Sequence, residues 1–271
     1  MTLPSRPRAV VTGAGSGLGR AICLQLARRN ARVLLADVNI EGAKETAAMM
    51  SGAETHVMRC DVTKSDEVRA LADEMDSRWG GTDLLVNNAG VAVGGLVGDI
   101  PLEDWHWIVD VNLWGVVYGC HWFVPRMRKQ GSGAILNVAS AAGLLCAPSM
   151  SAYNVTKAGV VALSETLYSE LKDAHIPVSV LCPTFFITNI AASARGSDPN
   201  MKDFVHKLMS KSKVQADDVA RIAIEAVESK RLYVLPHEDG RWFWRLKRAA
   251  PQRFYDLAAD RFKKMAPPSM R

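Results

Sequence analysis

Tyr153 and Lys157 are the two residues whose types and spacing most directly suggest chemistry. They are four positions apart in a segment with helical periodicity, which places both side chains on one face, one turn apart. A free tyrosine, with a pKa of about 10, is a poor base at neutral pH, but a nearby cation lowers that value by about 1–3 units. The pair therefore predicts a group that moves a proton on or off a carbonyl oxygen.

Two other polar residues give this pair its significance. A Y-x-x-x-K spacing alone occurs by chance and usually marks a solvated helix face. Ser140 ends an expected strand thirteen residues before Tyr153, and Asn112 lies on the preceding expected helix. Together the four residues predict a catalytic site.

A glycine-rich turn predicts a nucleotide site near the amino terminus. The turn Thr12–Gly19 reads TGAGSGLG, and it follows an apolar strand and opens a helix. Glycines allow the backbone to approach a pyrophosphate, and the helix amino terminus supplies N–H groups with positive partial charge. A tight turn without a ligand could use the same residues, so the context of strand and helix carries the prediction.

Asp37 indicates which dinucleotide binds there. It ends the second strand, 24 residues after Gly13, where a carboxylate can bind the ribose hydroxyls of adenosine and repel a 2′-phosphate. No Arg or Lys stands at Ser16, Val38 or Asn39 to bind that phosphate. The sequence therefore favours NAD over NADP, against the alternative that Asp37 only caps a turn.

These residues need an α/β framework, and the pattern of the chain provides one. Short apolar segments alternate with amphipathic segments of helical length, which predicts a parallel sheet covered on both faces. The predicted strands are Arg8–Thr12, Arg32–Asp37, Glu54–Asp61, Asp83–Asn87, Gly133–Ser140, Ile176–Cys182 and Arg231–Leu235. The fold class is thus a single Rossmann-type, doubly wound sheet over residues 1–240, with ligands at the carboxyl ends of the strands.

Residues 184–213 interrupt this alternation. They contain Phe185, Phe186 and a Gly-Ser-Asp-Pro turn, followed by apolar residues at helical spacing: Met201, Val205, Leu208 and Met209. An insertion directly after a strand end is typical of a lid over a binding site. The alternative is a surface excursion with a small core of its own.

The chain resembles the short-chain dehydrogenases/reductases, in the branch with a T-G-x-x-x-G-x-G motif. The resemblance covers about Arg8 to Leu235, and its elements occur in the family order: TGAGSGLG, Asp37, Asp61-Val62, NNAG at Asn87–Gly90, Asn112, Ser140, Tyr153-x-x-x-Lys157, Pro183 and Thr188.

The resemblance implies a catalytic tetrad. Tyr153 would exchange the proton with the substrate oxygen, to which Ser140 would hydrogen-bond. Lys157 would hold the nicotinamide ribose and lower the pKa of Tyr153, while Asn112 would anchor a water that relays protons.

The resemblance also implies the cofactor contacts. Asp61 and Val62 would contact the adenine, Asn88 would brace the sheet, and Thr188 would bind the carboxamide. The family's usual Pro-Gly is Pro183-Thr184 here, so the backbone that carries Thr188 is expected to run differently. The full set is Gly13, Ser16, Gly17, Leu18, Gly19, Asp37, Asp61, Val62, Asn88, Ala89, Gly90, Tyr153, Lys157, Pro183 and Thr188.

Residues that follow strand ends predict an apolar substrate pocket. Val91, Val93, Leu145 and Phe186 belong to this group, and no Arg or Lys stands among them to hold a carboxylate or phosphate. An apolar alcohol or ketone is therefore expected, although some of these side chains could instead pack under the lid. The predicted substrate contacts are Ser140, Leu144, Met150, Tyr153 and Phe185.

Charge is concentrated in a carboxyl-terminal extension. Residues 241–271 have nine basic and two acidic residues, a net charge of +7, whereas the other 240 residues have a net charge of −2. The main body thus lacks the basic balance expected of a nucleic-acid-binding protein. Aromatic and basic residues alternate in the extension, and Pro251 is expected to split it into two helices.

Two interpretations of the extension stay open. It is either an amphipathic segment in weak contact with an anionic membrane surface, or a terminal element that packs on its own lid or on a neighbouring subunit. It is not expected to be an independent domain.

Composition bounds the remaining possibilities. The 271 residues are 48% hydrophobic and 23% charged, without an apolar run of about 18 residues or a signal-peptide pattern. Five separated cysteines without a C-x-x-C pair favour reduced thiols, a cytoplasmic location and the absence of a metal site.

The sequence therefore predicts an NAD-dependent oxidoreductase that interconverts an apolar secondary alcohol and its ketone, and the resemblance adds a homodimer or homotetramer built through helices 101–129 and 152–174. A 3-oxoacyl-type or NADP-using reductase is the alternative. An NAD-binding regulator or scaffold without turnover is a more distant one, and a dehydratase or epimerase would need a different glycine spacing.

Overall fold

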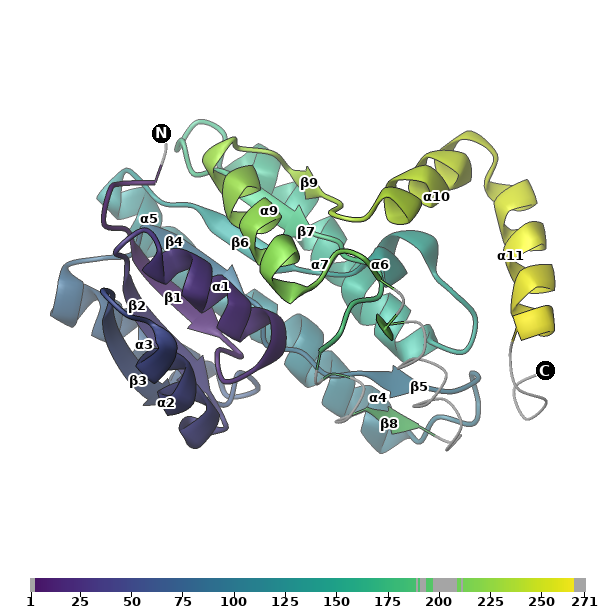
Figure 1. The fold of residues 1–271 in the computed structure, drawn as a ribbon, viewed down its shortest axis with the longest axis horizontal. Coiled ribbons are helices and arrows are strands. Elements are labelled where there is room, and N and C mark those ends of the chain that lie inside the picture. The colour runs from purple at the N-terminus through teal and green to yellow at the C-terminus, as the bar shows by residue number, and fades with distance from the viewer. Residues whose placement is uncertain (1–2, 189, 191–193, 197–208, 211, 266–271) are drawn as a thin grey trace.

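Seven parallel strands form the central sheet, in the order β3-β2-β1-β4-β6-β7-β9 (Figure 1). The strands are β1 (Arg8–Thr12), β2 (Arg32–Asp37), β3 (Glu54–Arg59), β4 (Leu84–Asn87), β6 (Ile135–Val138), β7 (Val178–Leu181) and β9 (Tyr233–Val234). This computed structural model describes residues 3–188, 190, 194–196, 209–210 and 212–265. The predicted doubly wound α/β fold is confirmed, and β3 ends two residues earlier than the sequence predicts.

Helices cover both faces of the sheet because successive strand residues point to opposite sides. In β1, Ala9 and Val11 pack in the core beneath α1 and α9, whereas Val10 packs in the core beneath α3 and α5. The main helices are α1 (Gly17–Ala27), α2 (Ile40–Met49), α3 (Ser65–Trp79), α4 (Leu102–Val109), α5 (Gly115–Gln130), α6 (Ala141–Leu145), α7 (Ser151–Glu170) and α9 (Ala216–Glu228).

The strand order places a crevice at the carboxyl ends of β1 and β4. β1 pairs in parallel with β2 on one side and with β4 on the other. The connections that leave these strands therefore run in opposite directions, and in such sheets ligands bind where the direction changes. The glycine-rich turn after β1 and the Asn-Asn-Ala-Gly segment after β4 both lie at this point.

The segment predicted as largely helical over 101–129 contains a feature that the sequence does not reveal. Between α4 and α5 the chain forms a π-helical turn, Asp110–Trp114, with Asn112 buried inside it. Periodicity cannot show such a turn, because it inserts one extra residue without interrupting the helix.

Part of the predicted lid, β8 (Arg195–Gly196), pairs in parallel with β5 (Val93–Gly94), a strand outside the lid. The two form a separate two-stranded sheet. The helical spacing predicted for Met201, Val205 and Leu208 lies outside the described residues.

The carboxyl-terminal extension forms two helices, α10 (Glu238–Ala249) and α11 (Pro251–Met265). Pro251 begins α11, as predicted, because a proline is tolerated in the first turn of a helix but not in its interior. Figure 1 shows α10 leaving the sheet beside α6 and α11 standing furthest from the body.

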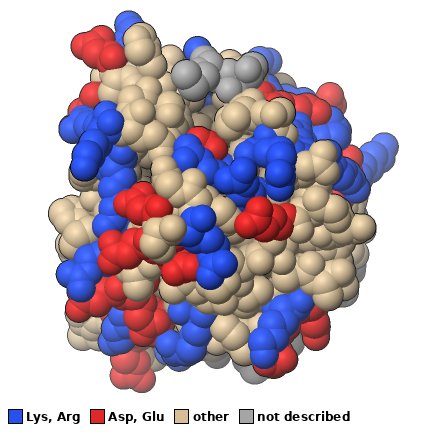
Figure 2. Space-filling model, turned by 90° about the vertical axis from the view of Figure 1, so that its left-hand side faces the viewer, with Lys and Arg blue, Asp and Glu red and all other residues tan. Residues whose placement is uncertain are grey.

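Charged side chains of both signs are interspersed on the face seen in Figure 2, which lies at the β3 end of the sheet. That face carries no continuous basic patch of the kind that binds nucleic acid. Within the described part of the chain, every helix is too short or too polar to cross a membrane.

Candidate active site

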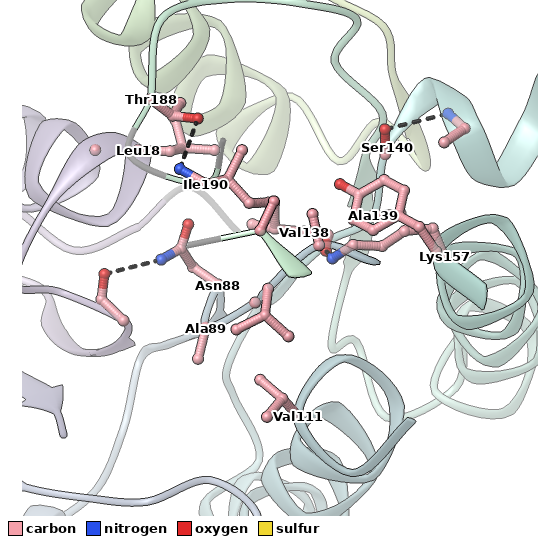
Figure 3. Close-up of a pocket in the computed structure, with 18 of the residues that line it drawn as sticks. Leu18, Asn88, Ala89, Val111, Val138, Ala139, Ser140, Lys157, Thr188 and Ile190 are labelled. Atoms are coloured by element: carbon pink, nitrogen blue, oxygen red, sulfur yellow. Dashed lines mark hydrogen bonds between the residues drawn. The ribbon is translucent and has the colours of Figure 1, made fainter. Parts of the chain in front are cut away.

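A cavity of about 1300 Å³ lies at the carboxyl ends of the strands. It runs from the glycine-rich turn, across the ends of β4 and β6, to α4, α6 and α10. All fifteen residues predicted to bind cofactor line it: Gly13, Ser16, Gly17, Leu18, Gly19, Asp37, Asp61, Val62, Asn88, Ala89, Gly90, Tyr153, Lys157, Pro183 and Thr188. Figure 3 shows Leu18 and Thr188 on one side of this cavity, with Ser140 and Lys157 on the other.

The turn after β1 fits a pyrophosphate. Helix α1 begins at Gly17 with its amino terminus at the cavity, and Ser16 at its N-cap position makes no side-chain capping hydrogen bond. The first turn of α1 contains no acidic side chain, so its backbone N–H groups and positive partial charge are available to bind an anion. Gly19 packs so closely on Gly13 that a Cβ atom there would collide with the Gly13 carbonyl oxygen.

The Asp37 carboxylate lies at the adenosine end of this cavity. It accepts hydrogen bonds from the backbone N–H groups of Gly15 at 2.7 Å and Asn39 at 2.8 Å. The nearby Arg20 is directed elsewhere: it donates to the Gly15 carbonyl oxygen at 2.7 Å and to Glu45 at 2.9 Å. In the described lining, no cation lies beside Asp37 to bind a 2′-phosphate.

The side chains of Asn88 and Asp61 are held by hydrogen bonds to other residues of the protein. The Asn88 side chain donates to the carbonyl oxygens of Thr12 at 2.8 Å and Gly13 at 3.1 Å, which ties the end of β4 to the glycine-rich turn. Asp61 accepts from the backbone and hydroxyl of Thr63 at 3.0 and 2.8 Å. Their contacts to a dinucleotide stay predictions.

Ser140 is held at the start of α6. It follows β6, and its hydroxyl accepts a hydrogen bond from the Ala142 N–H at 3.1 Å as the N-cap of the helix (Figure 3). It also donates to the Pro183 carbonyl oxygen at 3.4 Å. Helix α6 can lie against α7 because Gly143 has no side chain: a Cβ there would be 2.5 Å from the Lys157 carbonyl carbon.

Tyr153 and Lys157 project from the first turns of α7, and both are buried. The Lys157 ammonium is 5.7 Å from the centre of the Tyr153 ring and donates to the Val138 carbonyl oxygen at 2.9 Å. Burial raises the pKa of Tyr153 to about 12, against the opposing effect of hydrogen bonding with Ser140. Burial also lowers the pKa of Lys157 to about 8.

The protein alone therefore does not show the lowering of the Tyr153 pKa that the sequence predicts. Two features explain the difference. Burial disfavours the phenolate, and the Lys157 ammonium is bound to the main chain at Val138 instead of the phenolic oxygen.

Asn112 lies beside the cavity but does not form part of its described lining. Its side-chain oxygen accepts from the Val91 N–H at 2.8 Å, and its amide nitrogen donates to the Val91 carbonyl at 2.9 Å and to Thr156 at 3.3 Å. These bonds join the π-helical turn to the segment after β4 and to α7. Its predicted role in proton relay stays a prediction.

The far end of the cavity is mostly apolar. Ser140, Met150, Tyr153 and Phe185, all predicted to contact substrate, line the cavity, but Leu144 does not appear in the described lining. The Leu144 side chain packs in the core beneath α6, whereas the adjacent Leu145 lines the cavity, so contact of Leu144 with substrate stays a prediction.

Sequence reasoning missed several residues of this wall, among them Trp107, Arg195 and Phe243. Arg195 corrects the expectation of a wall without cations. Its guanidinium is 3.8 Å from the centre of the Trp107 ring and 2.9 Å from Asp104, so both its charge and its planar face are already engaged. Phe243 comes from α10, in an extension that the strand–helix pattern does not connect to the site.

No group of His, Cys, Asp and Glu side chains in the described residues could hold a metal ion. One cavity contains both the glycine-rich turn and Tyr153. A dinucleotide bound at the turn and a substrate bound at Tyr153 could therefore meet in this cavity.

Comparisons with known proteins agree with this arrangement. The short chain dehydrogenase family matches residues 7–198. The oxidoreductase SadH of Mycobacterium tuberculosis is 39% identical over 194 residues, 70% of each chain. The 3-oxoacyl-[acyl-carrier-protein] reductase FabG of Staphylococcus epidermidis is 32% identical over 232 residues, which cover 83% of this chain and 93% of FabG.

A solved structure shows the same fold. It is the crystal structure of a short chain dehydrogenase/reductase from Burkholderia phymatum in complex with NAD, with a TM-score of 0.86 and 36% identity. The match covers 91% of this chain and 94% of the other. The chain described here belongs to the short chain dehydrogenase family. It is an oxidoreductase with the Rossmann-like fold of that family.

The burial of Lys157 leads to a prediction about stability. At pH 7 its ammonium is charged in both the folded and the unfolded chain, but only the folded chain pays for removing it from water. We expect Lys157→Met to raise the free energy of unfolding at pH 7 by about 1–3 kcal/mol. This gain shrinks between pH 8 and 10.5, because the folded wild type releases the Lys157 proton first.

Urea denaturation of the cofactor-free proteins at pH 7 and 9.5 measures this effect. Lys172→Met, which removes the same charge from an exposed position, is the control and should change stability little. A Lys157→Met protein that is less stable than the wild type at pH 7 contradicts the account.

Proposed function

We propose that this protein is an NAD-dependent oxidoreductase that interconverts an apolar secondary alcohol and its ketone. The observation that carries the proposal is that Ser140, Tyr153 and Lys157 share one cavity with the open amino terminus of α1. The glycine-rich turn and Lys157 would hold NAD, which would supply the hydride acceptor for alcohol oxidation and, as NADH, the hydride donor for ketone reduction.

The chain's own residues perform the proton transfer. During alcohol oxidation, the Tyr153 oxygen takes the proton from the substrate hydroxyl while Ser140 hydrogen-bonds the same substrate oxygen. Tyr153 accepts this proton as the phenolate and becomes the neutral phenol; Lys157 stabilises the phenolate before the transfer and holds the cofactor ribose. In ketone reduction Tyr153 donates the proton. We assign to Asn112 the water that exchanges this proton with solvent.

The preference for NAD rests on Asp37. A carboxylate at the end of β2 accepts hydrogen bonds from ribose hydroxyls and repels a 2′-phosphate. Arg20, the cation that contacts the same turn, is bound to Glu45.

We expect Asp37→Ser to reduce the ratio of kcat/KM for NAD to that for NADP at least about tenfold, a difference of about 1.4 kcal/mol. Steady-state kinetics with both cofactors measure this ratio. Asp66→Ser, at an exposed position in α3, is the control that should leave it unchanged. A wild-type preference for NADP contradicts the role given to Asp37.

Apolar side chains at the substrate end support the substrate class. Val93, Met150, Phe185 and Phe186 line it, and the guanidinium of Arg195 is already bound to Asp104. A buried apolar wall favours a substrate with an apolar body. A 3-oxoacyl thioester is the second candidate, supported by the 32% identity to FabG. NAD binding without turnover is the alternative that kinetics must exclude.

Turnover by the wild type and Tyr153→Phe tests the proposal. We expect NADH formation from NAD with at least one of three kinds of secondary alcohol: hydroxysteroids, secondary aryl alcohols and 3-hydroxyacyl thioesters. We expect Tyr153→Phe to lower kcat by about 10²–10⁴-fold, because it removes the acid–base group. Tyr168→Phe, on the outer part of α7, is the control. A Tyr153→Phe enzyme with wild-type kcat contradicts the proposal.

We also propose a homodimer or homotetramer. Trp114 and Val155 are 46% and 54% exposed on the π-helical turn and α7, the helices that the family resemblance assigns to subunit contacts. Sedimentation at micromolar concentration measures the assembly, and a monomer contradicts it. Five free cysteines in the described chain support a reducing, cytoplasmic compartment.

A further inference from the structure

Helix α10 contributes directly to the substrate end of the cavity. Phe243 and Asp239, both from α10, form part of the described lining beside α6. They lie after the last strand of the sheet, in a segment that the Rossmann fold itself does not require. The question is whether α10 merely covers the cavity or is held there as a fixed wall.

Thr184 fixes the start of α10. Its N–H group donates to His237 Nδ1 at 3.3 Å, and its hydroxyl donates to Asp239 at 3.4 Å. Gly240 packs against it so closely that a Cβ atom on Gly240 would be 2.8 Å from the Thr184 methyl carbon. The bond to Asp239 and the contact with Gly240 both require the Thr184 side chain, at the position where the family resemblance leads to an expectation of glycine.

Lys247 fixes the other end of α10. Its ammonium donates to the Leu144 carbonyl oxygen at 2.5 Å, in the last turn of α6. A cation at a helix carboxyl terminus satisfies an unpaired carbonyl and interacts favourably with the helix dipole. Because Ser140 is the N-cap of the same five-residue helix, Lys247 connects α10 to the helix that positions Ser140.

The second helix of the extension, α11, contacts both Phe243 and Lys247. Phe254 of α11 is buried, and its ring is 6.3 Å from that of Phe243. The Tyr255 ring lies 5.3 Å from the Lys247 ammonium. On the other side of α10, the Trp244 ring packs 4.9 Å from that of Tyr233, in β9. Phe243 and Lys247 are thus both held in place by contacts with α11.

We propose that α10 is the outer wall of the substrate pocket, that Phe243 is a specificity-determining residue, and that Lys247 is a positioning residue for that wall. The substrate is then an alcohol or ketone whose apolar body extends from the reacting carbon to α10. This inference rests on the proposed function, because it concerns the substrate of the same site.

The test compares ketones of increasing size in NADH-dependent reduction: cyclohexanone, 2-decalone and a 3-oxosteroid. The ratio compared is kcat/KM for the largest ketone that the wild type reduces, divided by kcat/KM for cyclohexanone. We expect Phe243→Ala to lower this ratio at least about tenfold, mainly by raising KM for the larger ketone. Trp242→Ala is the matched control, since Trp242 is adjacent, 59% exposed and outside the described lining. An unchanged or increased ratio in Phe243→Ala, or an equal fall in Trp242→Ala, overturns the proposal.

The positioning role of Lys247 is tested by substitutions that remove or keep its charge and by removal of a second cation elsewhere on α10. We expect Lys247→Met to raise KM for the largest ketone as Phe243→Ala does, Lys247→Arg to restore it in part, and Arg245→Met to leave it unchanged. Arg245 is the matched control, because it is an exposed cation on the same helix. Faster hydrogen exchange at the Cys146 amide, which donates to Ala142, is expected only in Lys247→Met. Equal effects of Lys247→Met and Arg245→Met overturn its positioning role.

A failure of the proposed function is distinguishable from a failure of this inference. The proposed function fails if the wild type neither oxidises any alcohol of the earlier panel nor reduces any of these ketones, and calorimetry of the same ketones with the NAD-loaded protein then becomes the readout. Weaker binding of the 3-oxosteroid to Phe243→Ala than to Trp242→Ala then supports the wall. Equal binding by the two variants, or no ketone binding by the wild type, overturns it.

Discussion

The buried ammonium of Lys157 is the interaction on which the site depends. It is 2% exposed and hydrogen-bonded to a main-chain carbonyl, and no carboxylate in the described structure forms an ion pair with it. A charge held in this way is unfavourable for folding, because removal from water is compensated only in part by one neutral acceptor. The same arrangement keeps the positive charge 5.7 Å from the centre of the Tyr153 ring, and in the proposed function it also faces a ribose hydroxyl of the cofactor.

The surrounding fold keeps this charge in place. Lys157 is anchored by Val138 at the end of β6, and α6 packs on α7 through Gly143 at the level of Lys157 itself. Ser140 lies between β6 and α6, and α6 packs on α7, so these three elements together determine where Ser140, Tyr153 and Lys157 lie. Beyond α6, α10 extends this set of contacts into the carboxyl-terminal region through Lys247.

The sequence predicts the framework well because its signals are local and periodic. Apolar strands, the glycine-rich turn and the four-residue spacing of Tyr153 and Lys157 each depend on residues close together in the chain. The features it missed depend on distant contacts or on geometry without periodicity. Examples are the π-helical turn around Asn112, the inward rotation of Leu144 and the arrival of Phe243 from a helix about 90 residues after Tyr153.

The pKa of Tyr153 shows the same limit. The identity and spacing of Tyr153 and Lys157 indicate a cation that lowers the pKa of the phenol, but burial has the opposite effect and dominates in the protein alone. Spacing gives the neighbours of a group, whereas its solvation depends on the whole surrounding structure. In this account the positive nicotinamide ring and the ribose contact of Lys157 complete the environment that lets Tyr153 lose its proton.

The most direct test is therefore the pKa of Tyr153 with and without NAD, measured by NMR of protein labelled with ¹³C at the tyrosine ζ carbon. The chain has five tyrosines, so Tyr153→Phe assigns the resonance. The account predicts a pKa near 12 in the protein alone and a value lower by about 1 or more once NAD is bound. A pKa that stays the same or rises on binding NAD contradicts the acid–base role of Tyr153.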